Sequence, residues 1–371
     1  MRMPDKKVDP SSPSPYTLTL PAIRGIQSGR EYYTTMIPLG LLSKHFFFDS
    51  GNLPPELRAQ RVITKSRIPE MARYILMNQK NYVFSALTAS IDSRVVFVPI
   101  KEYDPHGRLG LLTVPTEAQF LINDGQHRKA AIDAALKEDP KLARETIALV
   151  LFVDAGLKRS QQMFADLNKY SVRPTRSLGV LYDHEDVLAE VSRDLLVKVP
   201  LFIDRIDKER TTISHRSQYL FTLSAVYQAT KALLGKKSKL DSITIEEKVL
   251  AEEFWTELPN HIIEWQMLLD GKTSASDLRK DYVHSHGVIL QALGSAGREL
   301  IKKNPNTWRE QLKKLQSIDW SKSNHQWEGR AMIGGRLSKA IMNVILTTIY
   351  LKRTLGLSLT PSEEITDQRH L

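Results

Sequence analysis

The sequence predicts an α+β protein, with an N-terminal mixed sheet that carries helices and an all-helical C-terminal domain. Three observations lead to this prediction. The 371 residues suggest two domains rather than one. Short β-rich and apolar segments, bounded by turn residues, recur up to about residue 153. After about residue 177 these strand signals fade, and apolar residues recur at helical spacing.

The N-terminal domain is expected to begin with a hairpin. Residues 17–26 and 30–37 are β-rich, and the turn residues 27–29 lie between them. Apolar side chains at helical spacing predict a helix over residues 68–77. Further strands are expected at residues 82–91, 95–100 and 111–114. Residues 147–153 are seven consecutive apolar residues, which give the clearest prediction of a buried strand in the chain.

The C-terminal half contains six segments with helical periodicity, at residues 185–197, 217–234, 245–268, 285–303, 308–315 and 329–355. Polar stretches flank the two domains. We therefore expect a flexible tail at 1–16, a mixed-sheet domain at 17–178, a helical domain at 179–358 and a second flexible tail at 359–371.

The composition excludes several classes of protein. The chain has no Cys, which rules out disulfides and thiolate metal sites and fits a reducing cytoplasm. No apolar run reaches the length of a membrane span, and the polar N-terminus lacks the apolar core of a secretory signal. We therefore expect a cytoplasmic protein with no membrane partner.

The net charge is +10, from 52 basic and 42 acidic residues. Such a protein prefers polyanions, and nucleic acid is the commonest soluble one, so the composition permits double-stranded DNA as a partner. Many soluble proteins of this size are mildly basic without binding nucleic acid, so charge alone leaves both interpretations open.

The stretch from residue 120 to residue 136 contains the strongest functional signal. A short apolar run, turn residues and an Ala-rich segment predict a strand-to-helix junction at Asp124-Gly-Gln-His-Arg128. A helix N-terminus presents N–H groups and a positive dipole end to an anion. Gly125 permits close backbone approach, Arg128 adds a forked cation, His127 can exchange a proton, and Asp124 can hold a metal ion. Simple helix capping is the alternative interpretation.

This motif resembles the signature of the DGQHR-motif family, and its surroundings resemble the DndB-like proteins of DNA sulfur modification (phosphorothioation). Gly125, Arg128 and Ala131 are also similar to the Gly-x-x-Arg-x-x-Ala pattern of the ParB/sulfiredoxin-like fold. The resemblance implies that fold for the N-terminal domain, with a nucleotide, ATP or CTP with Mg²⁺, bound at the junction. Gln126 stands where sulfiredoxin has a Cys, so thiol chemistry is excluded.

The resemblance also implies other contacts to the nucleotide phosphates. Arg61, after Gln60, loosely matches a ParB-like segment that faces the nucleotide. Asn168, Lys169 and Arg173 match a second nucleotide motif and would close the site opposite Arg128. A helix C-cap is the alternative role of Asn168. The expected phosphate site thus comprises Arg61, Gly125, Gln126, Arg128, Asn168, Lys169 and Arg173.

Basic residues outside the motif are candidate DNA contacts. Residues 203–216 combine charges and hydroxyl groups, which is typical of loops that bind the DNA backbone, although a solvated interdomain loop is the alternative. Trp327 could stack on a base, whereas a core position is commoner for Trp. The expected DNA-binding residues are Arg176, Arg210, Arg216, Lys236, Lys237 and Arg330.

Three functions remain open from the sequence. The resemblance implies a DNA-binding regulator or accessory protein of a phosphorothioate modification and phage-defence system, with other proteins of that system as partners and a homo-oligomer as a further expectation. The second is a DNA-stimulated nucleotide hydrolase or nickase with Asp124, His127 and Arg128 as catalytic residues, which would require a second carboxylate such as Asp154 or Asp166. The third is a structural partner without DNA affinity. His284 and His286 are two residues apart, so we expect no zinc site there.

Overall fold

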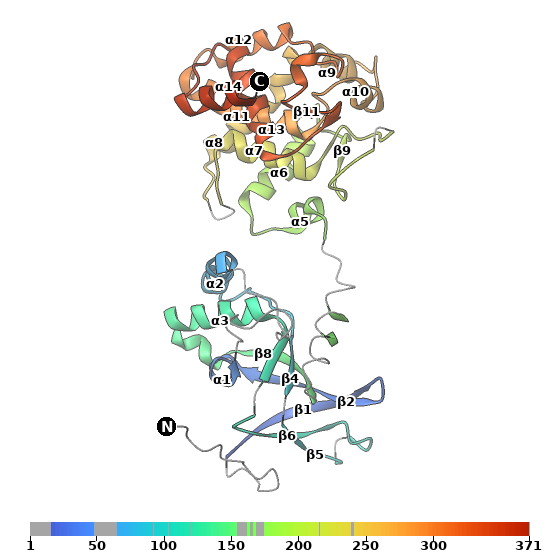
Figure 1. Cartoon of the computed structure of the whole chain (residues 1–371), viewed down its shortest axis with the longest axis vertical. Helices are drawn as coiled ribbons and strands as arrows, with labels where there is room; N and C mark the ends of the chain where they lie inside the picture. Colours follow the sequence, from blue (N-terminus) through green and yellow to red (C-terminus); the bar gives the residue numbers. More distant parts are fainter. Residues whose placement is uncertain are drawn as a thin grey trace. The chain divides into compact units, whose positions relative to one another are not determined.

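The structure of the chain is a computed structural model. It describes residues 16–47, 65–91, 93–102, 104–118, 120–153, 162–163, 166–167, 174–214, 216–238 and 241–370. The chain divides into two compact units, residues 1–172 and residues 173–371 (Figure 1). The first contains a mixed sheet with helices and the second is mostly helical, which confirms the predicted α+β class.

The N-terminal unit is built on one eight-stranded sheet in the order β3-β7-β4-β8-β2-β1-β6-β5. The pairs β3–β7 and β4–β8 are parallel and the other neighbours are antiparallel. The strands are β1 (Thr17–Gln27), β2 (Arg30–Pro38), β3 (Phe46–Phe47), β4 (Leu87–Ile91), β5 (Val96–Pro99), β6 (Leu109–Pro115), β7 (Phe120–Asp124) and β8 (Thr146–Val153). The predicted hairpin is therefore present as β1–β2. The strand predicted at 147–153 is present as β8, but only Ile147, Leu149 and Leu151 in it are buried, so one of its faces is only half-buried.

The turn of the β1–β2 hairpin explains why these strands pair locally. Ser28 and Gly29 both have positive φ, at 52° and 73°. Two positive φ angles in a two-residue loop give the twist that matches paired antiparallel strands. The short loop thus fixes the register in which Gln27 pairs with Arg30.

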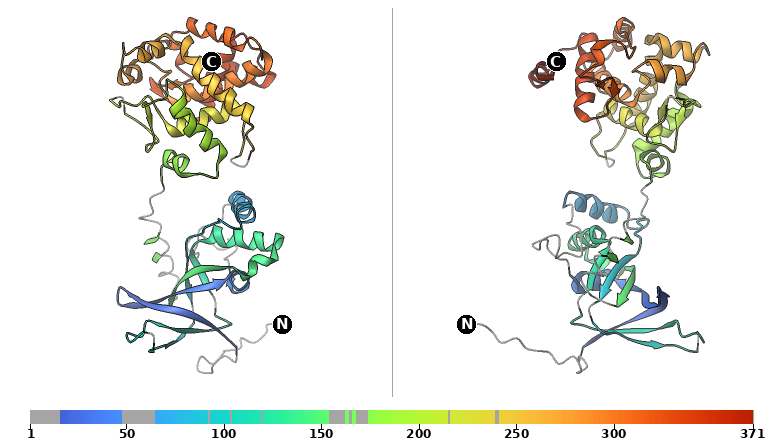
Figure 2. Two further views of the ribbon diagram at one scale, coloured as in Figure 1. Left: turned by 180° about the vertical axis from the view of Figure 1, so that it is seen from behind. Right: turned by 45° about the vertical axis from the view of Figure 1, so that its right-hand side comes forward.

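Helices cover one face of this sheet, and the two largest, α2 and α3, pack on each other (Figure 2). They are α1 (Leu39–His45), η2 (Lys65–Arg67), α2 (Ile68–Met77), α3 (Gln126–Glu138) and η3 (Pro140–Arg144). Leu42, Ile75 and Ala131 from the helices pack with Leu87 and Leu149 from the strands. Each of these side chains is fully buried, so their burial supplies much of the unit's stability.

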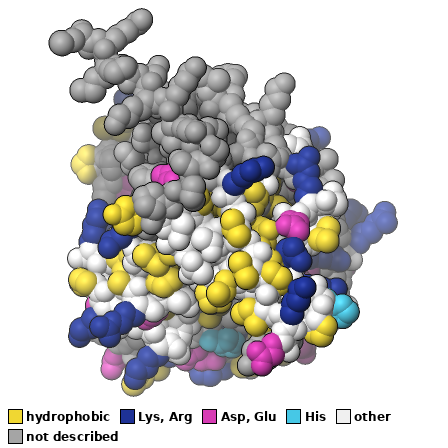
Figure 3. Space-filling model, turned by 90° about the horizontal axis from the view of Figure 1, so that it is seen from below, with side chains coloured by type: hydrophobic (Ala, Val, Ile, Leu, Met, Phe, Trp, Pro, Cys, Tyr) yellow, Lys and Arg dark blue, Asp and Glu magenta, His cyan; other side chains and the backbone are white. Residues whose placement is uncertain are grey.

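The other face of the sheet is partly apolar and exposed. Ile23, Met36, Val96, Val98 and Leu111 all point away from the core. Figure 3 shows hydrophobic side chains gathered with Lys and Arg side chains on one face of the molecule.

The C-terminal unit is a packed set of helices around a large apolar core. Its α-helices are α5 (Arg176–Tyr182), α6 (Val187–Lys198), α7 (Leu223–Leu234), α8 (Ile245–Glu257), α9 (Ile263–Leu269), α10 (Ala275–Asp281), α11 (Gly287–Lys303), α12 (Trp308–Gln311), α13 (Ile341–Thr354) and α14 (Pro361–His370). Single 3₁₀ turns are η4 (Leu258–His261), η5 (Leu312–Ser317) and η6 (His325–Trp327). Two short strand pairs complete it: β9 (Ile206–Asp207) with β10 (Phe221–Thr222), and β11 (Met332–Ile333) with β12 (Arg336–Leu337).

Helix α11 lies at the centre of this unit, against α7 and α13. A Cβ built on Gly294 would lie 2.3 Å from the carbonyl oxygen of Ala229 in α7. Only a residue without a side chain permits the two backbones to approach this closely. Trp255 and Trp265 are fully buried around the same core.

Three predicted features of this half are wrong in detail. The helix predicted at 329–355 begins only at Ile341, because Gly334 and Gly335 have positive φ and form the turn between β11 and β12. The helix predicted at 245–268 is broken at η4, whose second residue is Pro259. The tail predicted at 359–371 contains helix α14 instead.

Candidate functional site

The predicted strand-to-helix junction is present between β7 and α3. Gly125 links them with a φ of 103°, a left-handed conformation that favours glycine. A Cβ at this position would lie 2.3 Å from Leu87 Cδ2 in β4. Helix α3 has no side-chain N-cap, so its first turn keeps the positive dipole end that an anion would use.

Arg128 uses its guanidinium mainly within the fold. Its Nη1 donates to the carbonyl oxygen and the hydroxyl of Ser85, both at 2.6 Å, and to the carbonyl oxygen of Ala86 at 2.7 Å. Its Nη2 donates to Asp124 Oδ2 at 2.8 Å. The side chain is 15% exposed. Arg128 therefore fixes the segment before β4 to the first turn of α3, and it is charge-paired before any ligand arrives.

Gln126 also faces the protein. It is 6% exposed, and its Nε2 donates to the carbonyl oxygens of Ile122 and Asn123, both at 3.0 Å. These bonds close the end of β7, where a strand running into a turn leaves carbonyl groups unpaired. The predicted contact between the Gln126 side chain and a phosphate would require these bonds to break.

Asp124 and His127 are the motif side chains with access to solvent. The Asp124 side chain is 45% exposed, although one of its oxygens is paired with Arg128. His127 is half-buried on the first turn of α3. A phosphate at this junction would meet backbone N–H groups and His127, next to an ion pair whose net charge is zero.

Lys129 is a junction residue that the sequence prediction did not select. It is buried and forms an ion pair with Asp133 at 2.6 Å, one turn along α3. The other oxygen of Asp133 is buried without a hydrogen-bond partner. The i,i+4 spacing of Lys129 and Asp133 is visible in the sequence, but the burial of the pair is not.

Several predicted contacts lie outside the described residues. Arg61, Asn168, Lys169 and Arg173 are among these, as is Asp154. Their closure over the junction therefore stays a prediction. Asp166, the other candidate second carboxylate, accepts a hydrogen bond from Gln162 Nε2 at 2.7 Å.

No three His, Cys, Asp or Glu side chains come together as a metal site across the residues that the structure describes. His284 is fully buried and stacks on Tyr282, and its Nε2 lies 3.5 Å from Glu264. Burial lowers the pKa of His284, against the opposing effect of Glu264. His286 instead contacts the carbonyl oxygen of Arg279.

The six predicted DNA contacts fall into two groups. Arg176, Arg210, Arg216 and Lys237 are exposed. Lys236 is half-buried and pairs with Glu247 at 2.6 Å. These five residues remain available to a polyanion to differing degrees.

Arg330 is the exception, because it is only 9% exposed. Its guanidinium lies over the ring of Tyr350 and donates to the carbonyl oxygen of Gln326 at 2.7 Å. Trp327 is fully buried nearby and donates to the carbonyl oxygen of Asp319. Both side chains are buried in the core, and this placement argues against direct DNA contact by either one.

The sequence prediction missed a group of basic residues around a cavity in the C-terminal unit. Arg279, Lys322 and Lys339 lie far apart in sequence and share no motif, but they line one cavity. Thr212 lines it too, and it belongs to the charged and hydroxyl-rich segment 203–216. The charged and hydroxyl-rich composition of this segment was the one local sign of the cavity in the sequence.

Comparison with known proteins gives one result that covers both units. The family model DndB, described as DNA-sulfur modification-associated, matches residues 20–358. No curated protein and no solved structure is similar enough to this chain to count as a match. Among the residues that the structure describes, no helix combines the length and apolar character needed to cross a bilayer.

Proposed function

We propose that this chain, which belongs to the DndB family of DNA-sulfur modification-associated proteins, is a DNA-binding regulator or accessory protein of a DNA phosphorothioate modification and defence system. The family match over residues 20–358 carries the proposal, since it gives the chain a role in a DNA sulfur modification system. The net charge of +10 supports direct contact with DNA rather than action through another protein alone. Other proteins of the same system and a second copy of the chain are further proposed partners.

The proposed DNA contacts are the exposed basic residues of the C-terminal unit. Arg176, Arg210 and Arg216 are exposed, and the described residues supply no ion-pair partner for any of them. Arginines of this kind contact DNA phosphates, release counterions and give an affinity that falls with salt. Such contacts position a protein on DNA without selecting a sequence.

A binding measurement on these arginines tests the proposal. Fluorescence anisotropy with a 30-bp duplex would be recorded over a series of salt concentrations. The triple variant Arg176→Ala/Arg210→Ala/Arg216→Ala should bind at least about ten-fold more weakly and reduce the slope of log K against log salt by up to about 3.

The matched control replaces three exposed lysines of the same unit, as Lys272→Ala/Lys302→Ala/Lys313→Ala. This control also removes three positive charges from the C-terminal unit, but at positions that are not proposed DNA contacts. Equal weakening in both triple variants would show that only net charge matters, and no binding by the wild type would overturn the proposal.

The junction between β7 and α3 is proposed to hold a phosphate of a nucleotide. The first turn of α3, which no side chain caps, the left-handed Gly125 and the neighbouring His127 support this role. Asp124 would hold Mg²⁺ beside the nucleotide phosphates, in the manner of a single protein carboxylate that completes a Mg²⁺ shell. Arg128 would act as a positioning residue, because its hydrogen bonds are made within the fold.

Binding is favoured over hydrolysis or nicking by the charges at this junction. A two-metal mechanism needs paired carboxylates, and Asp124 is paired with Arg128 instead. Nucleotide binding and nucleotide hydrolysis are distinguished by titrating ATP and CTP with Mg²⁺ and then assaying released phosphate. Turnover that disappears in Asp124→Ala and His127→Ala would establish the enzyme alternative.

A further inference from the structure

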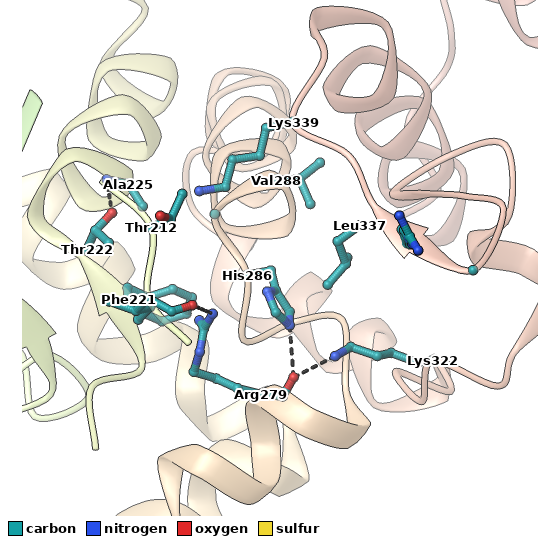
Figure 4. A pocket seen from close by; sticks show the side chains of 14 residues that line it. Thr212, Phe221, Thr222, Ala225, Arg279, His286, Val288, Lys322, Leu337 and Lys339 are labelled. Atoms are coloured by element: carbon teal, nitrogen blue, oxygen red, sulfur yellow. Dashed lines mark hydrogen bonds between the residues drawn. The ribbon is translucent and has the colours of Figure 1, made fainter. Parts of the chain in front are cut away.

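A cavity of about 340 Å³ in the C-terminal unit is lined by cations and by no acidic residue (Figure 4). It lies between the N-terminal ends of α7 and α11, the end of α10, and the segment from β12 to Lys339. Arg279, His286, Lys322, Arg336 and Lys339 all contribute to its wall. Four of them are cations, of which Arg279 is buried, Lys322 half-buried, and Arg336 and Lys339 exposed. Such a concentration of positive charge around a hollow favours an anion inside it.

Arg279 is the buried base of this cation group. It is 6% exposed, and it donates to the carbonyl oxygens of Ile213, Ser214, Leu220 and Ser285. Carbonyl dipoles satisfy its hydrogen bonds, but they leave its charge without a carboxylate. Burial lowers the pKa of Arg279 to about 10, because desolvation disfavours its charged form.

Lys322 lies beside Arg279. Its ammonium donates to the carbonyl oxygens of Arg279 at 2.5 Å and of Lys280 at 2.9 Å. His286 Nε2 contacts the same Arg279 carbonyl at 3.1 Å, and Figure 4 shows both contacts. Burial and the charge of Arg279 lower the pKa of Lys322, against the opposing effect of the nearby Asp281 carboxylate.

Lys339 brings a further cation to the start of α11. A Cβ built on Gly287, the first residue of that helix, would lie 3.6 Å from the Lys339 nitrogen. The described residues offer this ammonium neither a carboxylate nor a hydrogen-bond acceptor. A cation beside a helix N-terminus is opposed by the helix dipole. The Lys339 side chain is exposed overall, but desolvation and the charge of Arg279 lower its pKa, so a bound anion would favour its charged form.

The first turn of α11 adds donors to the same cavity. Its N-cap, His286, makes no side-chain capping bond. Gly287 and Val288 line the cavity, and they belong to the first turn of α11, where backbone N–H groups have no partner within the helix. Helix α7 differs, because its N-cap Thr222 accepts from Ala225 N. Two N–H groups and two ammonium groups therefore surround one space.

We infer that this cavity binds a phosphate group, held by Lys339, Lys322 and the first turn of α11. A phosphate carries up to two negative charges and several acceptor oxygens, which fit multiple converging cations better than one carboxylate does. The cavity has room for a phosphate and an attached sugar. The phosphate could belong to a free nucleotide or to DNA, and this inference does not depend on the function proposed above.

The test is a titration of the full-length chain with inorganic phosphate, with dAMP and with a 15-bp duplex, at matched ionic strength. Isothermal calorimetry gives the affinity, and the melting temperature gives a second readout. Lys339→Met should weaken phosphate and dAMP binding by about 10- to 100-fold, the effect of one charge-assisted hydrogen bond. Lys313→Met removes an exposed lysine outside the cavity and should leave both affinities unchanged.

The same variants separate a ligand role from a structural one. Without phosphate, Lys339→Met should melt at the same temperature as the wild type or higher, because it relieves repulsion with Arg279. Binding of the duplex that depends on Lys339 would identify DNA as the source of the phosphate, and binding of dAMP alone would identify a free nucleotide. Equal phosphate affinity in wild type and Lys339→Met, or no binding of any probe, would overturn the inference.

Discussion

The β7–α3 junction and the cavity at the start of α11 both gather basic residues at a helix N-terminus, but they compensate the charge differently. At the junction, Arg128 is paired with Asp124 and Lys129 with Asp133. Around the cavity, the nearest acceptors of Arg279 and Lys322 are main-chain carbonyls. The cations of the junction therefore have carboxylate partners at ion-pair distance, whereas among the described residues Arg279 and Lys322 have none that close.

This difference separates two uses of an arginine or lysine. A cation whose donors are already engaged stabilises the fold, and its removal should lower stability first. A desolvated cation without a counter-charge costs stability, and a bound anion would offset that cost. The difference between the cations of the junction and those of the cavity can therefore be tested by measuring the stability of variants.

The largest expected effect is the loss of Arg128. The change Arg128→Ala leaves the carbonyl groups of Ser85 and Ala86 and the carboxylate of Asp124 without this donor. We expect the N-terminal unit to lose about 2–3 kcal/mol of unfolding free energy. Hydrogen exchange of β4 and α3 measures this, because it reports the opening of that unit alone.

The control for Arg128 is Lys137→Ala, which removes an exposed cation from the last turn of the same helix. It should change stability by less than about 0.5 kcal/mol. If Arg128→Ala were as stable as this control while nucleotide affinity fell, Arg128 would be a ligand-binding residue, and the contrast with the cavity would fail.

A smaller effect is expected at Gly125. The change Gly125→Ala adds a Cβ at a φ of 103° and places it 2.3 Å from Leu87 Cδ2, so we expect a loss of about 2 kcal/mol. Gly29→Ala provides the reference, because Gly29 also has positive φ but nothing lies within 4 Å of its Cβ position. It should cost about 1 kcal/mol. Urea unfolding of both variants measures the difference, and equal losses would show that contact with Leu87 is unimportant.

The sequence predicted the features that depend on neighbouring residues. The β1–β2 hairpin, helix α2 and strand β8 follow from turn residues and periodicity over short windows. The junction at Gly125 was located in the same way. Two other local signals oppose the periodicity or composition around them. Gly334-Gly335 interrupts a run with helical periodicity, and in the polar stretch after residue 359 Thr360 and Glu363 cap the start of α14 by accepting from each other's backbone N–H groups.

The partners of the charged side chains could not be predicted. Arg128 lies about 40 residues from the carbonyls that it binds, Ser85 and Ala86, and nothing in the motif indicates them. The cavity brings together Thr212, Arg279, Lys322 and Lys339, which only the folded helices make neighbours. Whether a cation is compensated is a property of tertiary structure, so a motif alone could not distinguish the two sites.

The smallest expected effect concerns a compensated lysine in the same unit as the cavity. Lys352 is 4% exposed, and its ammonium lies 2.7 Å from both carboxylate oxygens of Glu363 in α14. Desolvation raises the pKa of Glu363, but the bonds from Lys352 and Thr360 N outweigh it, and the net pKa lies below the usual value of 4.5. A carboxyl group whose pKa is lowered by folding stabilises the fold fully above its unfolded pKa, and this contribution is lost as the pH falls through the folded pKa.

We therefore expect α14 to be protected from hydrogen exchange at pH 6 and to lose protection below about pH 4, before the core helix α11 does. The variant Glu363→Gln should abolish this pH dependence of α14 and show low protection at both pH values, because Lys352 is then buried without its counter-charge. Removing the partner of a compensated lysine should weaken the unit, whereas removing an uncompensated lysine should not. Protection of α14 that stayed constant from pH 6 to pH 3 would show that this ion pair contributes nothing, and that compensation does not distinguish the two lysines.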